Sequence, residues 1–183
     1  MMWDLPLTVE IDGVRHNIRN QCDYRVILDI FKVFNDVELT DEEKFKCAIC
    51  IFYEDVEKIT NWEVALQKMM YVLNCGRQDD SQEQNKPKVM DWEYDFSIVA
   101  PAIGRVLGYD IRTPGKYIHW WTVYGAYMEI GDCLFANVIS IRSKRIKGKK
   151  LEDYERKFYE ENKSLIDLPK TLTQEEQDWL DNG

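Results

Sequence analysis

The first pattern along the chain is an alternation of apolar and polar residues, which is typical of a half-buried β-strand. The positions that share one face of this alternation are Leu7, Val9, Ile11, Val14, His16 and Ile18. Between its two arms lies Asp12-Gly13, a pair that readily adopts the two positive φ angles of a type I′ turn. The pattern predicts an N-terminal β-hairpin. Because a lone hairpin is marginally stable in water, we expect it to pack on other elements.

Beyond the hairpin, apolar residues recur every three or four positions, which predicts amphipathic helices. The first helix is expected to run from a cap at Asp23 to about Asn35. The second begins at the capping box Thr40–Glu43, and the third at a similar box, Thr60–Glu63. Gly76 is expected at the C′ position that ends the third helix.

A polar stretch then divides the chain. Residues 77–88 contain no apolar residue other than Pro87, so this stretch cannot bury surface. We therefore predict an N-terminal part at 1–76, a polar linker at 77–90 and a helical C-terminal part at 91–183.

Helical spacing returns in the C-terminal part. The stretches expected to be helical are Asp91–Leu107, Lys116–Ile130, Leu134–Arg145, Leu151–Leu165 and Thr173–Leu180. Pro101 is expected to kink or restart the first of them. The whole pattern predicts a mainly α fold, a bundle of about seven helices with an N-terminal β-hairpin, packed as one or two bundles.

Composition and charge disfavour several classes of protein. The chain has 183 residues, of which 45% are hydrophobic, and its net charge of −9 disfavours binding to duplex DNA. Its five cysteines, an odd number, do not indicate a disulfide framework. With no signal peptide and no uncharged stretch of the ~20 residues that span a membrane, we expect a soluble intracellular protein.

Two cysteines have the spacing Cys47-x-x-Cys50, which also occurs in redox and zinc motifs. A redox pair places its first thiol at a helix N-terminus, whereas this pair lies well inside the helix that begins after Thr40. Zinc would require two more ligands, and Cys75 and Cys133 have no paired spacing. We therefore expect both thiols to pack in the core of a central helix that is apolar nearly all round.

The sequence offers little support for an enzyme. Of two histidines, His119 is the stronger candidate for acid–base chemistry, but its apolar flanks favour a structural hydrogen bond. No phosphate-binding loop, dinucleotide fingerprint, zinc-protease motif or serine-hydrolase motif occurs. We expect a protein without catalytic residues, metal or cofactor.

A cluster of basic residues stands out in this acidic chain. Its members are Arg142, Lys144, Arg145, Lys147, Lys149 and Lys150. Basic side chains at a helix C-terminus complement the helix dipole, which is one interpretation. The other is a binding patch for an acidic partner. The sequence leaves both interpretations open.

The segment Tyr117–Met128 is dense in large aromatic side chains. Trp121 is expected in the core, whereas Trp120 and Tyr127 lie on a second stripe that is either buried or available to a protein partner. We take Trp120 and Tyr127, together with the six basic residues, as the candidate partner-binding set.

Four motifs resemble one known family in their order and spacing. They are Tyr94-Asp95-Phe96, Leu107-Gly108-Tyr109-Asp110-Ile111, Ile118-His119-Trp120-Trp121 and Ile139-Ser140-Ile141-Arg142. With the basic turn and charged helix that follow, the chain resembles the gene-product-fifteen family of phages and prophages of Gram-positive bacteria. The likeness is strongest over Tyr94–Leu168.

This resemblance implies a function, because genes of that family typically lie just upstream of the tape-measure gene of siphophages. It implies a non-catalytic tail-assembly chaperone that binds the tape-measure protein, acts in the host cytoplasm and is absent from the mature virion. Self-association stays open, and neither membrane nor nucleic acid is an expected partner. The alternative class is a structural tail or head–tail connector component, and an enzyme is the third.

Overall fold

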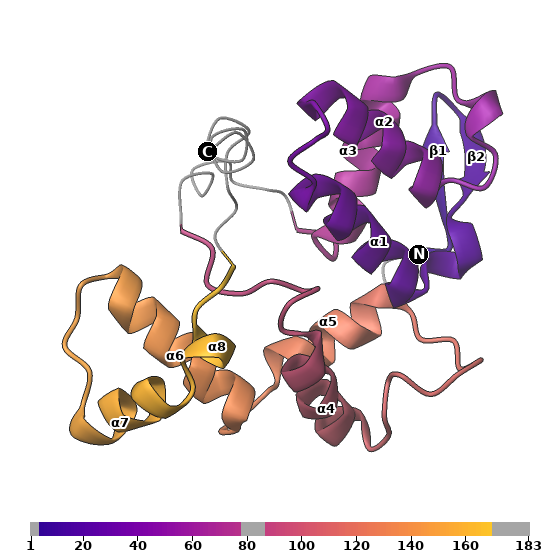
Figure 1. Ribbon diagram of the computed structural model, residues 1–183. Helices are drawn as coiled ribbons and strands as arrows, with labels where there is room; N and C mark the ends of the chain where they lie inside the picture. The colour runs from indigo at the N-terminus through magenta and orange to yellow at the C-terminus, as the bar shows by residue number, and fades with distance from the viewer. Residues whose placement is uncertain (1–3, 78–86, 170–183) are drawn as a thin grey trace. The chain divides into compact units, whose positions relative to one another are not determined.

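The computed structural model describes residues 4–77 and 87–169 (Figure 1). Within these ranges it contains eight α-helices, two 3-10 helices and one two-stranded antiparallel sheet. The predicted mainly α fold with an N-terminal hairpin is therefore confirmed. The described residues form two compact units, one of residues 4–77 and 115–125 and the other of residues 87–114 and 126–169.

These units differ from the sequential division expected from composition. Residues 115–125 belong to the unit that contains the N-terminal hairpin, although they follow the expected linker. Most of that linker, residues 78–86, and the helix expected over Thr173–Leu180 lie outside the described residues.

The hairpin consists of β1 (Thr8–Ile11) and β2 (Val14–Asn17), paired antiparallel. Its turn, Asp12-Gly13, has φ values of 49° and 80°, both in the left-handed region as predicted. Beyond β2, Ile18 forms an antiparallel bridge with Tyr53. The hairpin is thus held against the helical part of its unit.

Three helices complete this unit, with caps that agree closely with the sequence pattern. The helices are α1 (Tyr24–Asn35), α2 (Asp41–Phe52) and α3 (Trp62–Leu73), and the 3-10 helices are η1 (Arg19–Cys22) and η2 (Val56–Lys58). Asp23 caps α1, and Thr40 and Glu43 form the predicted capping box of α2. The cap of α3 is Asn61 rather than Thr60, because the Asn61 side chain accepts the Val64 N–H.

The core of this unit lies between the three helices. Its fully or almost fully buried side chains include Ile27, Ile30, Ala48, Ile49, Phe52, Ala65 and Met69. The core position expected for Cys47 and Cys50 is wrong, since both thiols are exposed. Neighbouring elements bury only the face of α2 that carries Ala48, Ile49 and Phe52, so this helix is amphipathic. Among the described residues, no group of three His, Cys, Asp or Glu side chains could hold a metal ion.

Helix α3 ends in a Schellman motif. The Gly76 N–H donates to the Tyr71 carbonyl at 2.8 Å, and the Cys75 N–H donates to the Val72 carbonyl at 3.1 Å. The left-handed C′ residue is therefore Cys75, with φ of 52°, and the predicted Gly76 follows it with φ of 79°. A side chain at position 76 would also meet the Trp121 ring, because a Cβ there would lie 3.2 Å from it.

Among its described residues, the second unit contains helices and connecting loops and no strand. It contains α4 (Phe96–Leu107), α6 (Leu134–Ile146), α7 (Asp153–Glu161) and α8 (Lys163–Ile166), and α5 (Trp120–Met128) begins in the first unit and ends in the second. Val138, Ile141 and Ile166 form a buried cluster that Phe158 and Leu165 flank. The stretch expected as one helix over Leu151–Leu165 is interrupted at Asn162, which separates α7 from α8.

Helix α4 differs from expectation at its start. It begins at Phe96 rather than Asp91, because the Asp91 carboxylate accepts the N–H groups of Glu93 and Tyr94 and holds them in a turn. The helix then continues through Pro101 without restarting.

Candidate partner-binding surface

The six basic residues of the cluster surround the C-terminus of α6. The helix ends in a Schellman motif, in which the Gly148 N–H donates to the Arg145 carbonyl and the Lys149 N–H to the Lys144 carbonyl. Gly148 has φ of 64°, a conformation that favours glycine. The glycine thereby fixes the path of the chain past the helix end.

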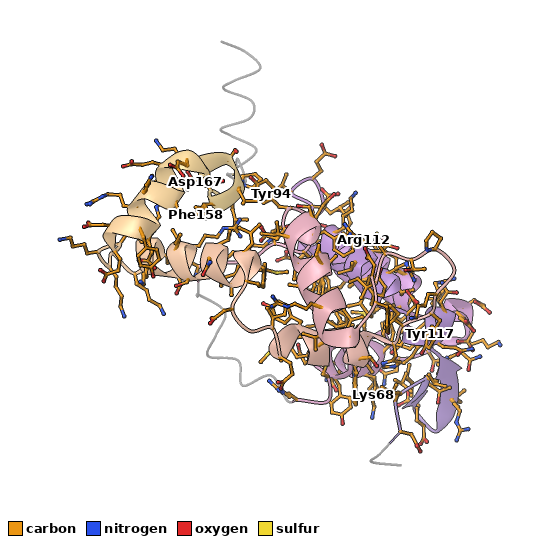
Figure 2. The ribbon with its side chains drawn as sticks, turned by 90° about the horizontal axis from the view of Figure 1, so that it is seen from below. Lys68, Tyr94, Arg112, Tyr117, Phe158 and Asp167 are labelled. Atoms are coloured by element: carbon orange, nitrogen blue, oxygen red, sulfur yellow. The ribbon has the colours of Figure 1, made fainter. Side chains whose placement is uncertain are left out.

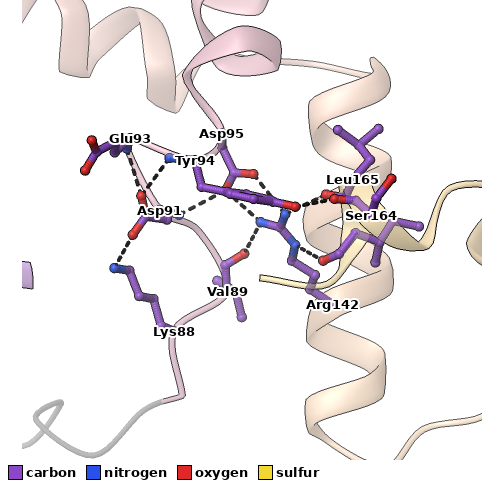
Figure 3. Close-up of polar contacts among 10 residues, drawn as sticks. Lys88, Val89, Asp91, Glu93, Tyr94, Asp95, Arg142, Ser164 and Leu165 are labelled. Carbon is purple, nitrogen blue, oxygen red and sulfur yellow. Dashed lines mark hydrogen bonds and ion pairs between the residues drawn. The ribbon is translucent and has the colours of Figure 1, made fainter. Parts of the chain in front are cut away.

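Arg142 does not belong to the exposed surface. Its guanidinium lies in the interior of the second unit, where Asp95 accepts two hydrogen bonds from it at 2.7 and 2.9 Å (Figure 3). The carbonyls of Val89, Leu165 and Ile166 accept the others. All five N–H donors of the side chain are therefore used within the unit.

The inclusion of Arg142 in the partner-binding set is corrected by this geometry. The side chain is 4% exposed and that of Asp95 is fully buried, so the pair belongs to the interior of the unit and presents almost no surface to a partner. Sequence reasoning did not identify Asp95 as the counter-ion. A signal was present, because Asp95 and Arg142 lie in two of the four motifs that carried the family resemblance.

Lys144 and Arg145 are also paired, but nearer the surface. Lys144 donates to both carboxylate oxygens of Glu155 in α7, at 2.6 and 2.8 Å. This hydrogen bonding lowers the pKa of Glu155 and raises the pKa of Lys144. Arg145 pairs with Asp167 and lies 4.0 Å above the ring of Tyr159. Both residues thus connect α6 to the segment that follows it.

Lys147, Lys149 and Lys150 are the remaining members, and we call them the free lysines. All three are exposed, and none has an ion pair with any residue that the structure describes. Both interpretations of the basic cluster, the helix end and the binding patch, stay open for these three residues. Half of the cluster serves the fold, and the other half presents three positive charges to solvent.

A pocket lies at the C-terminal end of α6, and we call it the α6–α8 pocket. It has a volume of about 330 Å³ and is lined by Lys88, Arg142, Arg145, Ile146, Ile166, Asp167 and Leu168. Phe158 and Asp167 are labelled in Figure 2, and of the two only Asp167 lines this pocket. The lining combines apolar side chains with a charged edge, a composition suited to an amphipathic peptide.

Trp120, a residue of the candidate set, is buried in the first unit and is 1% exposed. Its indole N–H donates to the Leu73 carbonyl at 2.9 Å, and its ring packs edge-on against Phe31. The structure therefore places Trp120 in the core and removes it from any partner surface. The neighbouring Trp121, expected in the core, is partly buried and donates to the Val72 carbonyl at 2.8 Å.

Tyr127 lies in the second unit and is partly buried. Its ring packs between those of Trp92, at 5.2 Å, and Phe135, at 5.9 Å. Only part of this side chain is accessible, so of the aromatic candidates Tyr127 alone keeps a place at the surface. Its role in binding stays a prediction.

His119 makes structural hydrogen bonds, as expected from its apolar flanks. Its Nε2 lies 3.1 Å from the Pro6 carbonyl, and its Nδ1 accepts the Trp121 N–H at 3.0 Å. Since the carbonyl can only accept and the amide can only donate, the ring is neutral with its proton on Nε2. Burial lowers the pKa of His119, which is consistent with the neutral form.

None of the helices formed by the described residues is both long enough and apolar enough to cross a membrane. Comparison with curated proteins and with solved structures found no match to either. A protein family does match, over residues 2–168, and its description is bacteriophage Gp15 protein. This span includes the hairpin, all eight described helices and the basic turn, so the chain belongs to the bacteriophage Gp15 protein family.

Proposed function

We propose that this phage protein is a tail-assembly chaperone that binds the tape-measure protein without catalysing a reaction. It would act in the host cytoplasm and be absent from the finished virion. Membership of the bacteriophage Gp15 protein family supports a phage protein, and the family resemblance described above implies the place in tail assembly.

The observation that carries the binding role is the set of free lysines that follows α6, together with the α6–α8 pocket, which Ile146 at the end of this helix lines. Three unpaired positive charges within four positions repel one another, and no described residue compensates them, although the chain has a net charge of −9. The dipole of α6 favours a basic residue at its C-terminus by only about 0.3–1 kcal/mol, so fold stability gives a weak reason for this arrangement. An acidic, amphipathic segment of a partner would satisfy the lysines and place apolar side chains in the pocket.

Co-purification with the tape-measure protein of the same phage tests this proposal. Changing Lys147, Lys149 and Lys150 to Gln should reduce the recovered tape-measure protein several-fold, and raised salt should do the same for the unmodified chain. A matched control changes three exposed lysines of the first unit, Lys46, Lys58 and Lys68, to Gln. This control alters net charge equally and should leave recovery unchanged.

Mass spectrometry of purified virions distinguishes the alternative class. A chaperone should be absent from the particles, whereas a structural tail or head–tail connector component should be present in stoichiometric amounts. If the variant of the free lysines and the control variant recover the same amount of tape-measure protein, the free lysines do not bind it.

A further inference from the structure

Two thiols on α2 face solvent and take no part in the core or in the proposed function. Cys47 and Cys50 are both exposed, whereas Ala48, Ile49 and Phe52 are buried on the opposite face of the helix. Free cysteine is among the residue types most often buried, because its side chain behaves as a small apolar group. Core packing therefore does not account for this exposed pair.

The two thiols are neighbours on the surface of α2. Residues three positions apart in an α-helix have Cβ atoms about 5–6 Å apart. A disulfide needs Cβ atoms about 3.5–4.5 Å apart, so Cys47 and Cys50 cannot form one without distorting the helix. A metal ion accepts the wider spacing, because a bond of about 2.3 Å joins it to each sulfur atom. The helix geometry thus favours chelation over a disulfide.

The chain supplies no further sulfur or imidazole ligand to this pair. Its other Cys and His residues all lie among the described residues, and they are His16, Cys22, Cys75, His119 and Cys133. In the described part of the chain, no group of three His, Cys, Asp or Glu side chains could hold a metal ion. A tetrahedral site has four ligands, so two more must come from another molecule.

We propose that Cys47 and Cys50 bind Zn²⁺ and that a second copy of the chain completes the site with the same two cysteines. Four thiolates in a tetrahedron are a common ligand set of structural zinc, and a two-fold axis through the ion closes the arrangement. Each chain releases two protons as its thiols become thiolates and bind the ion, so binding strengthens as the pH rises. This site does not rest on the proposed chaperone function.

Charges near the pair are consistent with this arrangement. Four thiolates around Zn²⁺ leave a net charge of 2 − 4 = −2 at the centre. Lys46 lies one helical turn before Cys50, so each copy brings to the edge of the site an ammonium group, which also pairs with Glu42 at 2.6 Å. Because each chain has a net charge of −9, two copies repel one another, and we expect them to associate only with the ion.

Titration of the reduced, metal-free chain with Co²⁺ tests the site, because cobalt replaces zinc in thiolate sites and gives a sulfur-to-metal charge-transfer absorption. This absorption should appear and saturate at one ion per two chains, and added Zn²⁺ should remove it, since zinc binds such ligands more tightly. Light scattering should give the mass of two chains with Zn²⁺ and of one chain after a chelator removes the ion.

The double variant Cys47→Ser, Cys50→Ser should lose both the absorption and the association with Zn²⁺. Its circular dichroism spectrum should stay unchanged, because both side chains are exposed. The matched control is Cys133→Ser, which removes a thiol but keeps a side chain able to cap α6. This control should bind Co²⁺ and associate like the unmodified chain.

Three outcomes would overturn the proposal. An absorption that persists in the double variant would place the ion elsewhere, and saturation at one ion per chain would exclude ligands from a second copy. The mass of two chains in the presence of the chelator would show that the ion does not join them. None of these measurements contains the tape-measure protein, so their failure leaves the proposed function untouched, and loss of tape-measure binding in the co-purification experiment leaves the metal site standing.

Discussion

At the scale of single residues, Arg142 joins three segments of the second unit that are far apart in the sequence. Its guanidinium bonds to Val89 and Asp95 on one side and to Leu165 and Ile166 on the other. A buried ion pair of this kind is costly to break, because the surviving partner stays buried without its counter-charge. The same residue looks like one of six solvated bases in the sequence. Its partner Asp95 lies 47 positions away, a separation that no local pattern reveals.

Replacing Arg142 by Met should therefore lower the free energy of unfolding by about 3–5 kcal/mol. Changing Asp95 to Leu in the same chain should recover part of this loss, since no buried charge is then left unpaired. Urea unfolding measures the free energy of unfolding of the single and the double variant. The control is Arg145→Gln, which breaks an exposed pair and should cost under about 1 kcal/mol. Equal costs for Arg142→Met and Arg145→Gln would contradict the structural role of Arg142.

At the scale of elements, the segment before α5 shows where local pattern stops predicting. Helical spacing begins at Lys116, yet residues up to His119 are not helical. The Asp23 carboxylate accepts the Ile118 N–H at 3.1 Å, and the Ile118 carbonyl accepts the Tyr24 N–H at 3.0 Å. These bonds connect positions about 95 apart, so the late start of α5 is a tertiary effect. The hairpin turn and the caps of α1 and α2 were predictable because each depends on a few neighbouring residues.

His119 connects this segment to Pro6 and also caps α5 through Trp121. Burial lowers its pKa, while the Pro6 carbonyl and Asp23 act in the opposite direction. A base whose pKa is lower in the folded state contributes stability above its unfolded pKa, near 6.5, and this contribution is lost as the pH falls below that value.

We therefore expect the free energy of unfolding to decrease between pH 7.5 and 5.5, with a slope from this residue of at most about 1.4 kcal/mol per pH unit. The variant His119→Asn keeps a side-chain acceptor for the Trp121 N–H and removes the titrating group. Urea unfolding at both pH values should show a smaller decrease for the variant. An identical decrease in both proteins would assign the pH dependence to other groups.

At the scale of the whole molecule, composition shows where the chain changes from apolar to polar, but it does not show which segments pack together. The polar stretch 77–90 indicated two sequential parts, whereas residues 115–125 pack with the first. The reason lies at the end of α3, where the last carbonyls of a helix lack partners within it. The Trp120 indole donates to the Leu73 carbonyl, and the Trp121 indole adds a second donor to the Val72 carbonyl, which already accepts the Cys75 N–H. Aromatic density predicted that this segment would be buried somewhere, but not that it would cover α3.

The free lysines show a similar limit for the candidate surface. Six bases in nine positions indicated one patch, and the sequence left its role open between a helix end and a binding site. Arg142, Lys144 and Arg145 form ion pairs with Asp95, Glu155 and Asp167, whereas the free lysines form none with the described residues. This difference depends on the folded positions of the three carboxylates, which the sequence pattern does not give. The charges alone do not identify the partner, because they specify its chemistry and not which protein carries that chemistry.

The packing of residues 115–125 leads to a prediction about folding. A fragment of residues 1–77 contains the hairpin and α1 to α3, but it lacks the side chain of Trp120, which is 1% exposed in the structure. Losing a buried tryptophan costs about 3–5 kcal/mol, a large share of the roughly 5–15 kcal/mol that stabilises a typical domain. The carbonyls of Val72 and Leu73 would also lose their indole donors. We therefore expect the fragment alone to unfold at a much lower temperature than the same region of the full chain, or without a cooperative transition.

Adding a peptide of residues 115–128 to this fragment should restore a cooperative thermal transition, measured by circular dichroism. The melting temperature should rise with peptide concentration, because the peptide binds only the folded fragment. A control peptide with Trp120→Ala and Trp121→Ala should have little effect, since it supplies neither the buried ring nor the two indole donors. If residues 1–77 alone unfold cooperatively at the temperature reached with saturating peptide, then residues 115–125 lie on an already complete unit. If only the unmodified peptide restores the transition, the first unit is built from two separate stretches of the chain, and the second stretch is needed to complete its core.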